Sequence, residues 1–395
     1  MERYLVLPNT KKPKYILPLL NKEVTGSSLN LYVPFTLLRK IQVFFLRLFI
    51  RLEIASFFIP ERWKTQEIKN FLPAEKHFSF GDWLCEILKV KSLKYAIYTG
   101  APGYYRKTTV QIMSNGGQIL GYAKVATSPQ TWARLRREAE VLEVLRSLTI
   151  PNAIFPKILA IEETHQELIV LQSAPSANYM MVSIHMTDAI STFLSDMFNR
   201  AKTFHNFAES LPYKNTNRRI MHIIPKVNVS WKERFQKATK ILSERMSNVE
   251  IPCGLCHYDF KPWNLRINER SGRLFVFDWE LARTSWTPLT DYFHFIIQPA
   301  ILVNRMKPEC ILERILNPPN SMRKSLLTYI DSIDMEKRLY LYIFLFYLLD
   351  ASSFCLEKAL LSSDKDAADT LFISQLGSLF SLCIDYMCTE RDSVV

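Results

Sequence analysis

The residues of this chain with the clearest capacity for chemistry lie in one short stretch, residues 256–265. It reads Cys-His-Tyr-Asp-Phe-Lys-Pro-Trp-Asn-Leu and contains the spacing H-x-D-x-x-x-x-N. Transfer of a phosphoryl group to a hydroxyl needs a side chain that orients the attacking oxygen, and it needs oxygen ligands for magnesium. Asp259 can accept the proton of an acceptor hydroxyl, and Asn264 can reach a metal from the same loop. The stretch therefore contains side chains that suit phosphoryl transfer.

A second carboxylate follows this loop. Asp278 ends the apolar run Phe-Val-Phe and precedes Trp-Glu. A strand in this position would hold the carboxylate rigidly and direct it into a cleft. We expect His257 to brace the loop by hydrogen bonding rather than to react. A single Asp or His in a loop is usually a turn residue or a satisfied polar group, but the spacing and the flanking residues favour a functional interpretation.

The loop resembles the Brenner motif of aminoglycoside phosphotransferases, choline kinases and related small-molecule kinases. These proteins carry H-x-D-x-x-x-x-N followed by an Asp on a strand, and the flanking Phe-x-Pro-Trp-Asn and Asp-Trp-Glu are similar to many bacterial members. The resemblance covers roughly residues 90–300. It implies a protein-kinase-like fold, ATP and Mg²⁺ as cofactors, and Asp259 as catalytic base. It also implies that Asn264 and Asp278 are the metal ligands.

The N-terminal half can be tested against this resemblance. A kinase-like fold needs a Lys on the third strand of the sheet, held by a Glu on the next helix. Lys124 lies in a predicted strand and Glu138 in the predicted helix that follows. Glu140 is the alternative partner, but it lies about 200° around the helix from Glu138. We expect Glu138 to pair with Lys124, because the apolar residues of the helix lie on the side of Glu138.

The segment expected to cover the phosphates departs from the usual pattern. It reads Thr-Gly-Ala-Pro-Gly-Tyr-Tyr, with Gly100 and Gly103 but without the full G-x-G-x-x-G. Its backbone N–H groups could bind phosphate oxygens, or the segment could be a plain tight turn. Arg106 and Lys107 either assist phosphate binding or are solvated. The sequence leaves these alternatives open.

Two further residues of the second half resemble family positions. His205 resembles a His that is common on a helix of the family, although a buried structural His is an equal explanation. Asp291 resembles an Asp that follows the metal-binding strand. We expect Asp291 to support the catalytic loop as part of the scaffold.

The pattern of elements predicts an α+β protein of two lobes. From about residue 80, short runs rich in β-branched and aromatic residues predict strands, and a helix and mainly helical sequence follow. The expected strands are 95–99, 108–114, 119–126, 158–162 and 167–171, with a helix over 131–148 and a hairpin turn at Asn-Gly-Gly 115–117. The resulting bilobal protein-kinase-like fold has a small antiparallel N-lobe with one helix and a large, mainly helical C-lobe. The predicted boundaries are 1–78 for an N-terminal extension, 79–177 for the nucleotide-binding N-lobe, and 178–395 for the C-lobe with the catalytic loop and acceptor site.

The overall charge indicates which partners the protein favours, and the cysteines indicate in which cellular compartment it functions. The 395 residues carry 50 Lys and Arg against 38 Asp and Glu, a formal charge of +12 that favours anionic partners. No nucleic-acid-binding module is recognised, so we expect no nucleic acid. Seven cysteines, an odd number, are scattered along the chain, which favours a reducing, cytoplasmic setting. Cys253 and Cys256 form a single C-x-x-C without a second pair, and we expect them to be buried thiols rather than a zinc or redox site.

Residues 35–59 form the most apolar segment and predict a basic amphipathic helix. The segment carries too many charges to cross a membrane. Arg39, Lys40, Arg47 and Arg51 fall within a sector of about 120° around a helix, and apolar residues fill most of the remainder. The helix either packs on the body of the protein or lies on a membrane surface. Peripheral contact with the inner face of a membrane through residues 35–59 is therefore an alternative to a purely cytoplasmic location.

The acceptor and the oligomeric state cannot be predicted from the sequence. The resemblance implies a small-molecule hydroxyl, on a sugar, an amino alcohol or an aminoglycoside-like compound. A protein kinase is the first alternative, because residues 257–264 also resemble the protein-kinase catalytic loop, in which Lys261 would contact the transferred phosphate. Against it, Asp278 precedes Trp-Glu instead of Phe-Gly, and no Ala-Pro-Glu follows. A catalytically inactive binding protein is the second alternative, although each of the key polar residues is present.

Overall fold

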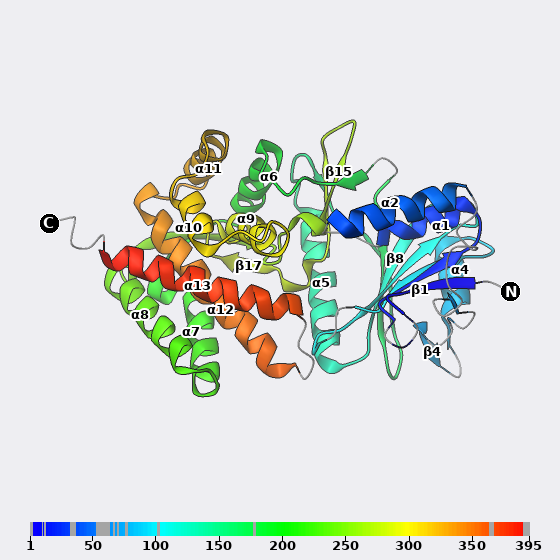
Figure 1. The fold of residues 1–395 in the computed structure, drawn as a ribbon, viewed down its shortest axis with the longest axis horizontal. Helices are drawn as coiled ribbons and strands as arrows, with labels where there is room; N and C mark the ends of the chain where they lie inside the picture. The colour runs from blue at the N-terminus through cyan, green and yellow to red at the C-terminus, as the bar shows by residue number, and fades with distance from the viewer. Residues whose placement is uncertain are drawn as a thin grey trace. The chain divides into compact units, whose positions relative to one another are not determined.

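The computed structural model describes residues 3–9, 11, 13–31, 37–52, 64–65, 68, 71–75, 78–100, 103–176, 179–362 and 367–389. The chain forms two compact units. Unit 1 comprises Met1–Arg146 and Phe155–Ala177, and unit 2 comprises Ser147–Ile154 and Asn178–Val395. Figure 1 shows the elements of each unit, coloured along the chain.

Unit 1 is built on an eight-stranded sheet in the order β10-β11-β8-β7-β6-β2-β1-β3. All neighbouring strands in it are antiparallel. The strands are β1 (Arg3–Leu7), β2 (Tyr15–Leu19), β3 (Lys64–Thr65), β6 (Lys94–Tyr98), β7 (Thr108–Met113), β8 (Ile119–Ala126), β10 (Ile158–Glu163) and β11 (Leu168–Ser173). The sequence predicted that residues 1–78 form a separate N-terminal extension. In the structure, β1, β2 and β3 of this segment continue the same sheet as β6 to β8.

Helices cover both faces of this sheet. They are α1 (Lys22–Ser28), η1 (Leu29–Leu31), α2 (Leu37–Arg51), α4 (Phe80–Leu88) and α5 (Pro129–Ser147), and the short hairpin β4 (Ala74–Glu75) and β5 (Phe78–Ser79) precedes α4. Side chains alternate between the faces along a strand. Tyr4 of β1 accordingly packs in one core cluster with Phe80 of α4, and Leu5 packs in another with Val24 of α1 and Ile50 of α2.

The local sequence pattern correctly predicted the secondary structure in the middle of unit 1. The predicted strands and the long helix correspond to β6, β7, β8, α5, β10 and β11. The hairpin turn between β7 and β8 contains Gly117 at φ 79°, where a Cβ would lie 2.5 Å from the carbonyl carbon of Glu23. The expectation that strands begin at about residue 80 was wrong. Ser79 caps a helix there by accepting a hydrogen bond from the backbone N–H of Asp82 at 3.4 Å.

In the described residues of unit 2, two small sheets combine with eight α-helices. Its sheets have the orders β12-β15-β16-β9 and β13-β14-β17. The strands are β9 (Ala153–Ile154), β12 (Tyr179–Met181), β13 (Thr203–Asn206), β14 (Glu250–Cys256), β15 (Leu265–Asn268), β16 (Leu274–Val276) and β17 (Arg283–Trp286). The helices are α6 (Asp188–Asn199), α7 (Leu211–Ile223), α8 (Val229–Met246), α9 (Thr290–Leu302), α10 (Pro308–Leu316), α11 (Asn320–Ser332), α12 (Tyr340–Leu361) and α13 (Ala367–Thr389), with short 3₁₀ turns η4 (Phe207–Glu209), η5 (Ile224–Lys226), η6 (Pro262–Asn264), η7 (Trp279–Leu281) and η8 (Lys337–Leu339). The predicted α+β class, with an antiparallel N-lobe sheet and a mainly helical C-lobe, is confirmed.

The two long C-terminal helices are apolar because they form much of the core of unit 2. Lys337–Leu361 and Asp369–Thr389 are long and apolar enough to cross a membrane by length and composition alone. Phe344 and Phe346 of α12 and Phe380 of α13 are, however, completely buried within the protein. Of the two apolar windows, 61% and 44% are buried, and burial of this kind is one source of such a composition in a protein core.

Candidate active site

In unit 1, the structure pairs Lys124 of β8 with Glu138 of α5. The ammonium group donates a hydrogen bond to Oε1 of Glu138. Lys124 is 6% exposed and Glu138 is fully buried, so each charge compensates the other away from water. Glu140 is exposed instead, with its carboxylate 3.6 Å from Nη1 of Arg137. The helix geometry had predicted this choice of Glu138 over Glu140.

A second cation approaches the same carboxylate. Nζ of Lys107 lies 3.9 Å from Oε2 of Glu138, and its side chain is 14% exposed. The sequence left open whether Lys107 assists phosphate binding or is solvated. Two ammonium groups therefore approach one buried carboxylate here, and cations in such a position can attract an anion such as a phosphate.

Residues 103–106, just before β7, form a turn in which the backbone N–H of Arg106 donates to the carbonyl oxygen of Gly103 at 3.1 Å. Gly100 and Gly103 have φ values of 83° and 139°, and a Cβ on Gly100 would lie 2.4 Å from the carbonyl oxygen of Lys107. Arg106 is not simply solvated, because its guanidinium donates to the carbonyl oxygen of Thr99 at 2.7 Å and to its hydroxyl at 3.0 Å. Residues 101–102 lie outside the described residues. Phosphate binding by Gly100 and Gly103 stays a prediction.

In unit 2, the catalytic loop runs from the end of β14 to η6. Asp291, in the first turn of α9, accepts hydrogen bonds from the backbone N–H groups of His257 at 2.7 Å and Tyr258 at 2.8 Å. Tyr258 has a positive φ of 69°, a strained conformation that the surrounding contacts must hold. Asp291 therefore supports the backbone of the loop, the scaffold contact expected from the sequence.

His257 links the loop to the strand that precedes Asp278. Its Nε2 lies 3.0 Å from the carbonyl oxygen of Phe277, and its Nδ1 accepts from the backbone N–H of Asp259 at 3.3 Å. The backbone N–H of Phe277 donates in turn to the carbonyl oxygen of Asn264 at 3.1 Å. The His257 ring is completely buried. These contacts suit a bracing residue rather than one that reacts.

The carboxylate of Asp259 lies among three polar side chains. Nζ of Lys261 lies 2.6 Å from Oδ2, Nδ2 of Asn264 donates to Oδ2 at 3.1 Å, and Nε2 of His294 lies 3.5 Å from Oδ1. Burial alone would raise the pKa of Asp259. Lys261 and His294 outweigh this effect and hold the pKa of the carboxyl well below its usual range. Asp259 is therefore ionised at neutral pH and can accept a proton.

His294 is a site residue that the sequence analysis missed. It lies one helical turn after Asp291 on α9, so both side chains lie on the same face of the helix. Nδ1 of His294 lies 3.3 Å from the hydroxyl of Tyr347 on α12, and the separation of 3.5 Å from Asp259 is at the outer limit of a hydrogen bond. The three-residue spacing from Asp291 was the signal that could have identified His294.

Asn264 and Asp278 are suited to hold Mg²⁺. Both hydrogen bonds from Asn264 to Asp259 use its amide nitrogen, so the amide oxygen is the atom left for a metal. Asp278 directly follows Phe277, whose N–H bonds to Asn264. No cluster of three or more His, Cys, Asp or Glu that could hold a metal occurs among the described residues. Two hard oxygen ligands, completed by phosphate oxygens and water, are typical of nucleotide-bound Mg²⁺.

Comparison with known proteins shows which family and which folds the chain is similar to. The model of the phosphotransferase enzyme family matches residues 122–297. Over these residues, which make up less than half of the chain, the sequence is similar to this family. The match includes Lys124, Glu138 and the whole catalytic loop, but begins after Gly100 and Gly103. The predicted family resemblance and the prediction of a phosphotransferase enzyme are therefore confirmed.

Solved structures show the same fold at low sequence identity. A candidate aminoglycoside phosphotransferase from Ralstonia eutropha JMP134 is similar with a TM-score of 0.51 and 12% identity, covering 77% of this chain and 96% of that chain. Choline kinase LicA from Streptococcus pneumoniae is similar with a TM-score of 0.51 and 14% identity, covering 76% of this chain and 98% of that chain. A comparison with curated protein sequences finds no match. The structural likeness confirms the kinase-like fold.

In this phosphotransferase, a buried carboxylate on α12 holds the Tyr258 side chain of the catalytic loop. Oδ2 of Asp350 accepts from the hydroxyl of Tyr258 at 2.8 Å, and Oδ1 accepts from Thr216 and from Nη1 of Arg219, both at 2.8 Å. The indole N–H of Trp286 lies 3.3 Å from Oδ2. Burial, and then Asp350, raises the pKa of Tyr258 well above its usual range, so its hydroxyl stays a donor. The network ties α7 and α12 to the loop.

Replacing Asp350 by Ala is therefore expected to destabilise the fold. The change leaves Arg219, whose side chain is only 10% exposed, without its main counter-charge, which costs about 3–5 kcal/mol in the free energy of unfolding. Urea denaturation followed by tryptophan fluorescence measures this change. Asp331→Ala is the matched control, because Asp331 pairs with Lys337 at 3.1 Å on the surface and its loss should cost below about 1 kcal/mol. Equal effects of the two variants would contradict the role of the network.

The sequence also led to predictions for His205, Cys253 and Cys256. The expectation for His205 was wrong, since His205 lies on strand β13, is exposed, and contacts the hydroxyl of Thr203 at 2.9 Å. Cys253 and Cys256 are buried thiols on β14, as predicted. Burial raises the pKa of Cys253 to about 12, so this thiol stays protonated and is a poor metal ligand.

Proposed function

We propose that this phosphotransferase moves the γ-phosphoryl group of MgATP to a hydroxyl of a small molecule, with Asp259 as catalytic base. The observation that carries the proposal is the position of the Asp259 carboxylate, held by Lys261 and Asn264 beside His294. A base that accepts the proton of an attacking hydroxyl must be ionised and fixed in position. Asp259 meets both requirements.

The remaining residues bind and orient the donor. Lys124, fixed by Glu138, binds the α- and β-phosphates, and Lys107 adds a second cation to this cluster. The turn at Gly100 and Gly103 offers backbone N–H groups to phosphate oxygens. Asn264 and Asp278 hold Mg²⁺, which would supply neutralisation of the phosphate charge during transfer. Lys261 lies beside the base and stabilises negative charge on the transferred group.

A small-molecule acceptor is favoured over a peptide by the segment after Asp278. In protein kinases, a long segment between the metal-binding Asp and the following helices orders the peptide substrate. Here η7, β17 and short turns occupy residues 279–289, and α9 begins at Thr290. This part of unit 2 therefore lacks a comparable peptide-binding segment. A sugar, an amino alcohol or an aminoglycoside-like compound is the proposed class of acceptor.

The proposal is tested by acceptor-dependent turnover. Purified protein is incubated with MgATP and pooled sugars, amino alcohols and aminoglycosides, and ATP consumption is measured with and without each pool. We expect consumption that requires one of the pools and that stops when Mg²⁺ is removed with EDTA. Binding of ATP without consumption in any pool would favour a catalytically inactive binding protein, and phosphorylation of a peptide pool alone would favour a protein kinase.

His294 provides a finer test of the base. His294→Ala removes one polar contact of Asp259 and is expected to lower kcat about tenfold, since such a contact is worth about 1–1.5 kcal/mol. The KM for ATP should stay within about twofold. His294→Gln keeps an N–H group on that side and should restore most of kcat. An unchanged kcat in His294→Ala would contradict a role of His294 in positioning the base.

A further inference from the structure

The helix α2 of unit 1 has two apolar faces, and only one of them is buried. Val43 is 7% exposed and Ile50 is 5% exposed. Ile50, together with Leu46 and Phe49, packs in the cluster that includes Leu5 of β1 and other core residues. This inner face packs α2 on the rest of unit 1. Packing on the body of the protein, one of the two interpretations of the sequence, therefore holds for this face.

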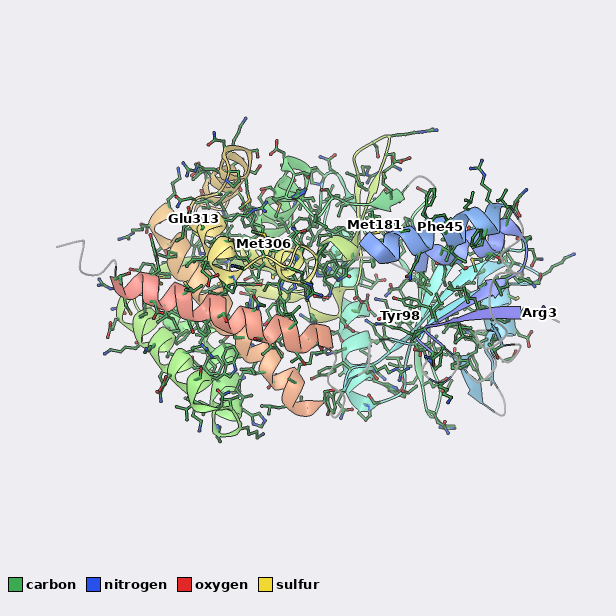
Figure 2. The ribbon with its side chains drawn as sticks, in the orientation of Figure 1. Arg3, Phe45, Tyr98, Met181, Met306 and Glu313 are labelled. Atoms are coloured by element: carbon green, nitrogen blue, oxygen red, sulfur yellow. The ribbon has the colours of Figure 1, made fainter. Side chains whose placement is uncertain are left out.

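The other face presents large apolar side chains to solvent. They are Ile41 (44% exposed), Phe44 (65%), Phe45 (49%), Leu48 (39%) and Leu52 (57%). Their spacing of three and four residues places them in one stripe about 100° wide along the helix. Phe45 is labelled on α2 in Figure 2. We name these five residues the apolar stripe of α2. A continuous row of this kind on a surface marks an interaction site.

Positive charge borders the apolar stripe. Arg47 and Arg51 are exposed, and their positions on the helix fall about 20–60° beyond the edge of the stripe, on the same side. Arginines along the border of an apolar face are typical of helices that lie in the interface of an anionic membrane. The formal charge of +12 of the chain acts in the same direction.

We propose that the apolar stripe of α2, with Arg47 and Arg51, docks this enzyme on an anionic lipid membrane. The aromatic and aliphatic side chains enter the boundary between headgroups and acyl chains, and the guanidinium groups bind the lipid phosphates. A second copy of the chain fits this surface less well. Self-pairing of the stripes would bring the arginines of both copies into one interface, and each copy carries the same positive net charge. The proposal goes beyond phosphoryl transfer and does not depend on it.

Sedimentation with lipid vesicles tests this proposal on the full chain. Neutral vesicles contain phosphatidylcholine alone, and anionic vesicles contain in addition about one-third phosphatidylglycerol. We expect binding to the anionic vesicles that weakens as salt is raised. Phe44→Ser combined with Phe45→Ser should weaken binding at least tenfold. Arg47→Gln combined with Arg51→Gln should weaken it about 30-fold, which corresponds to about 1 kcal/mol for each charge.

Ile161→Ser is the matched control, because Ile161 of β10 is 52% exposed in the same unit but lies outside the stripe. This variant should bind as the wild type does. Thermal unfolding of all variants shows whether they are folded. Absence of wild-type binding to anionic vesicles, or unchanged binding of the Phe44 and Phe45 variant, would overturn the proposal. So would a dimer of the wild type in light scattering that the same variant dissociates, because the stripe would then bind a second copy.

Discussion

Asp259→Asn is expected to lower kcat by about 10²–10⁴-fold, the contribution of a positioned general base. Asn has nearly the shape of Asp and can still accept a hydrogen bond from Lys261 or Asn264, so the loop should keep its conformation. The change removes the negative charge that accepts the proton of the acceptor hydroxyl. The Kd for MgATP, measured by titration calorimetry, should change by less than about threefold, whereas acceptor-dependent ATP consumption should be nearly abolished.

Asp331→Asn is the control for this prediction. Asp331 is an exposed carboxylate paired with Lys337 on the surface of unit 2, and its loss should leave kcat unchanged. A variant at Asp259 that retains more than about a tenth of the wild-type kcat would show that the carboxylate is not the base. Loss of both MgATP binding and the folded state would assign Asp259 a structural role instead.

The second large effect is expected at the buried pair of unit 1. Lys124→Met removes an ammonium group that is 6% exposed and leaves Glu138 fully buried, with Nζ of Lys107 3.9 Å from its Oε2. Breaking one side of a buried ion pair costs about 3–5 kcal/mol in the free energy of unfolding. The KM for ATP should rise at least tenfold as well, since a cation at the phosphates is lost.

A double variant separates stability from nucleotide binding. Lys124→Met combined with Glu138→Met replaces both buried charges by apolar side chains, a change that is often neutral for stability. We expect urea denaturation to show that the double variant regains most of the stability lost in Lys124→Met. Its KM for ATP should stay as high as that of the single variant. Recovery of a normal KM in the double variant would contradict a role of Lys124 in phosphate binding.

Local sequence patterns predicted the elements whose formation depends on neighbouring residues. The strands β6 to β8 and the helix α5 follow from periodicity and from a glycine-rich hairpin turn. The strands β1 and β2 were missed because each is short and follows an irregular start, and they are stabilised by pairing with each other and with distant β6. Helix α4 was missed because it is only nine residues long. Short elements of this kind are fixed by tertiary contacts more than by propensity.

The part of the candidate site that could be predicted from the sequence is the part whose residues follow a fixed spacing in one loop. Asp259, Asn264 and Asp278 follow from the motif, and the pairing of Lys124 with Glu138 follows from helix geometry. The sequence did not indicate that Asp350 contacts Tyr258, because these residues are far apart in the chain and meet only through the packing of α12. His294 was missed for a related reason, since its contact depends on where α9 begins.

For helix α2, the hydrophobic periodicity of the sequence predicted an amphipathic helix but not which of its apolar residues are buried. The sequence predicted α2 and offered either packing on the protein or exposure to a membrane. In the structure, Val43 and Ile50 are buried while Phe44 and Phe45 are exposed, so one helix has a packed face and an open one. Periodicity indicates an apolar face, but only the structure shows which part of it the protein itself covers.

The most direct test of the central claim is to follow the γ-phosphoryl group itself. ATP labelled with ³²P in the γ-position is incubated with the protein and a small-molecule extract, and the products are separated by thin-layer chromatography. The account predicts a labelled small molecule that forms with the wild type and is absent with Asp259→Asn. Equal labelling by both proteins, or label found only on protein, would contradict phosphoryl transfer from ATP to a small-molecule hydroxyl with Asp259 as base.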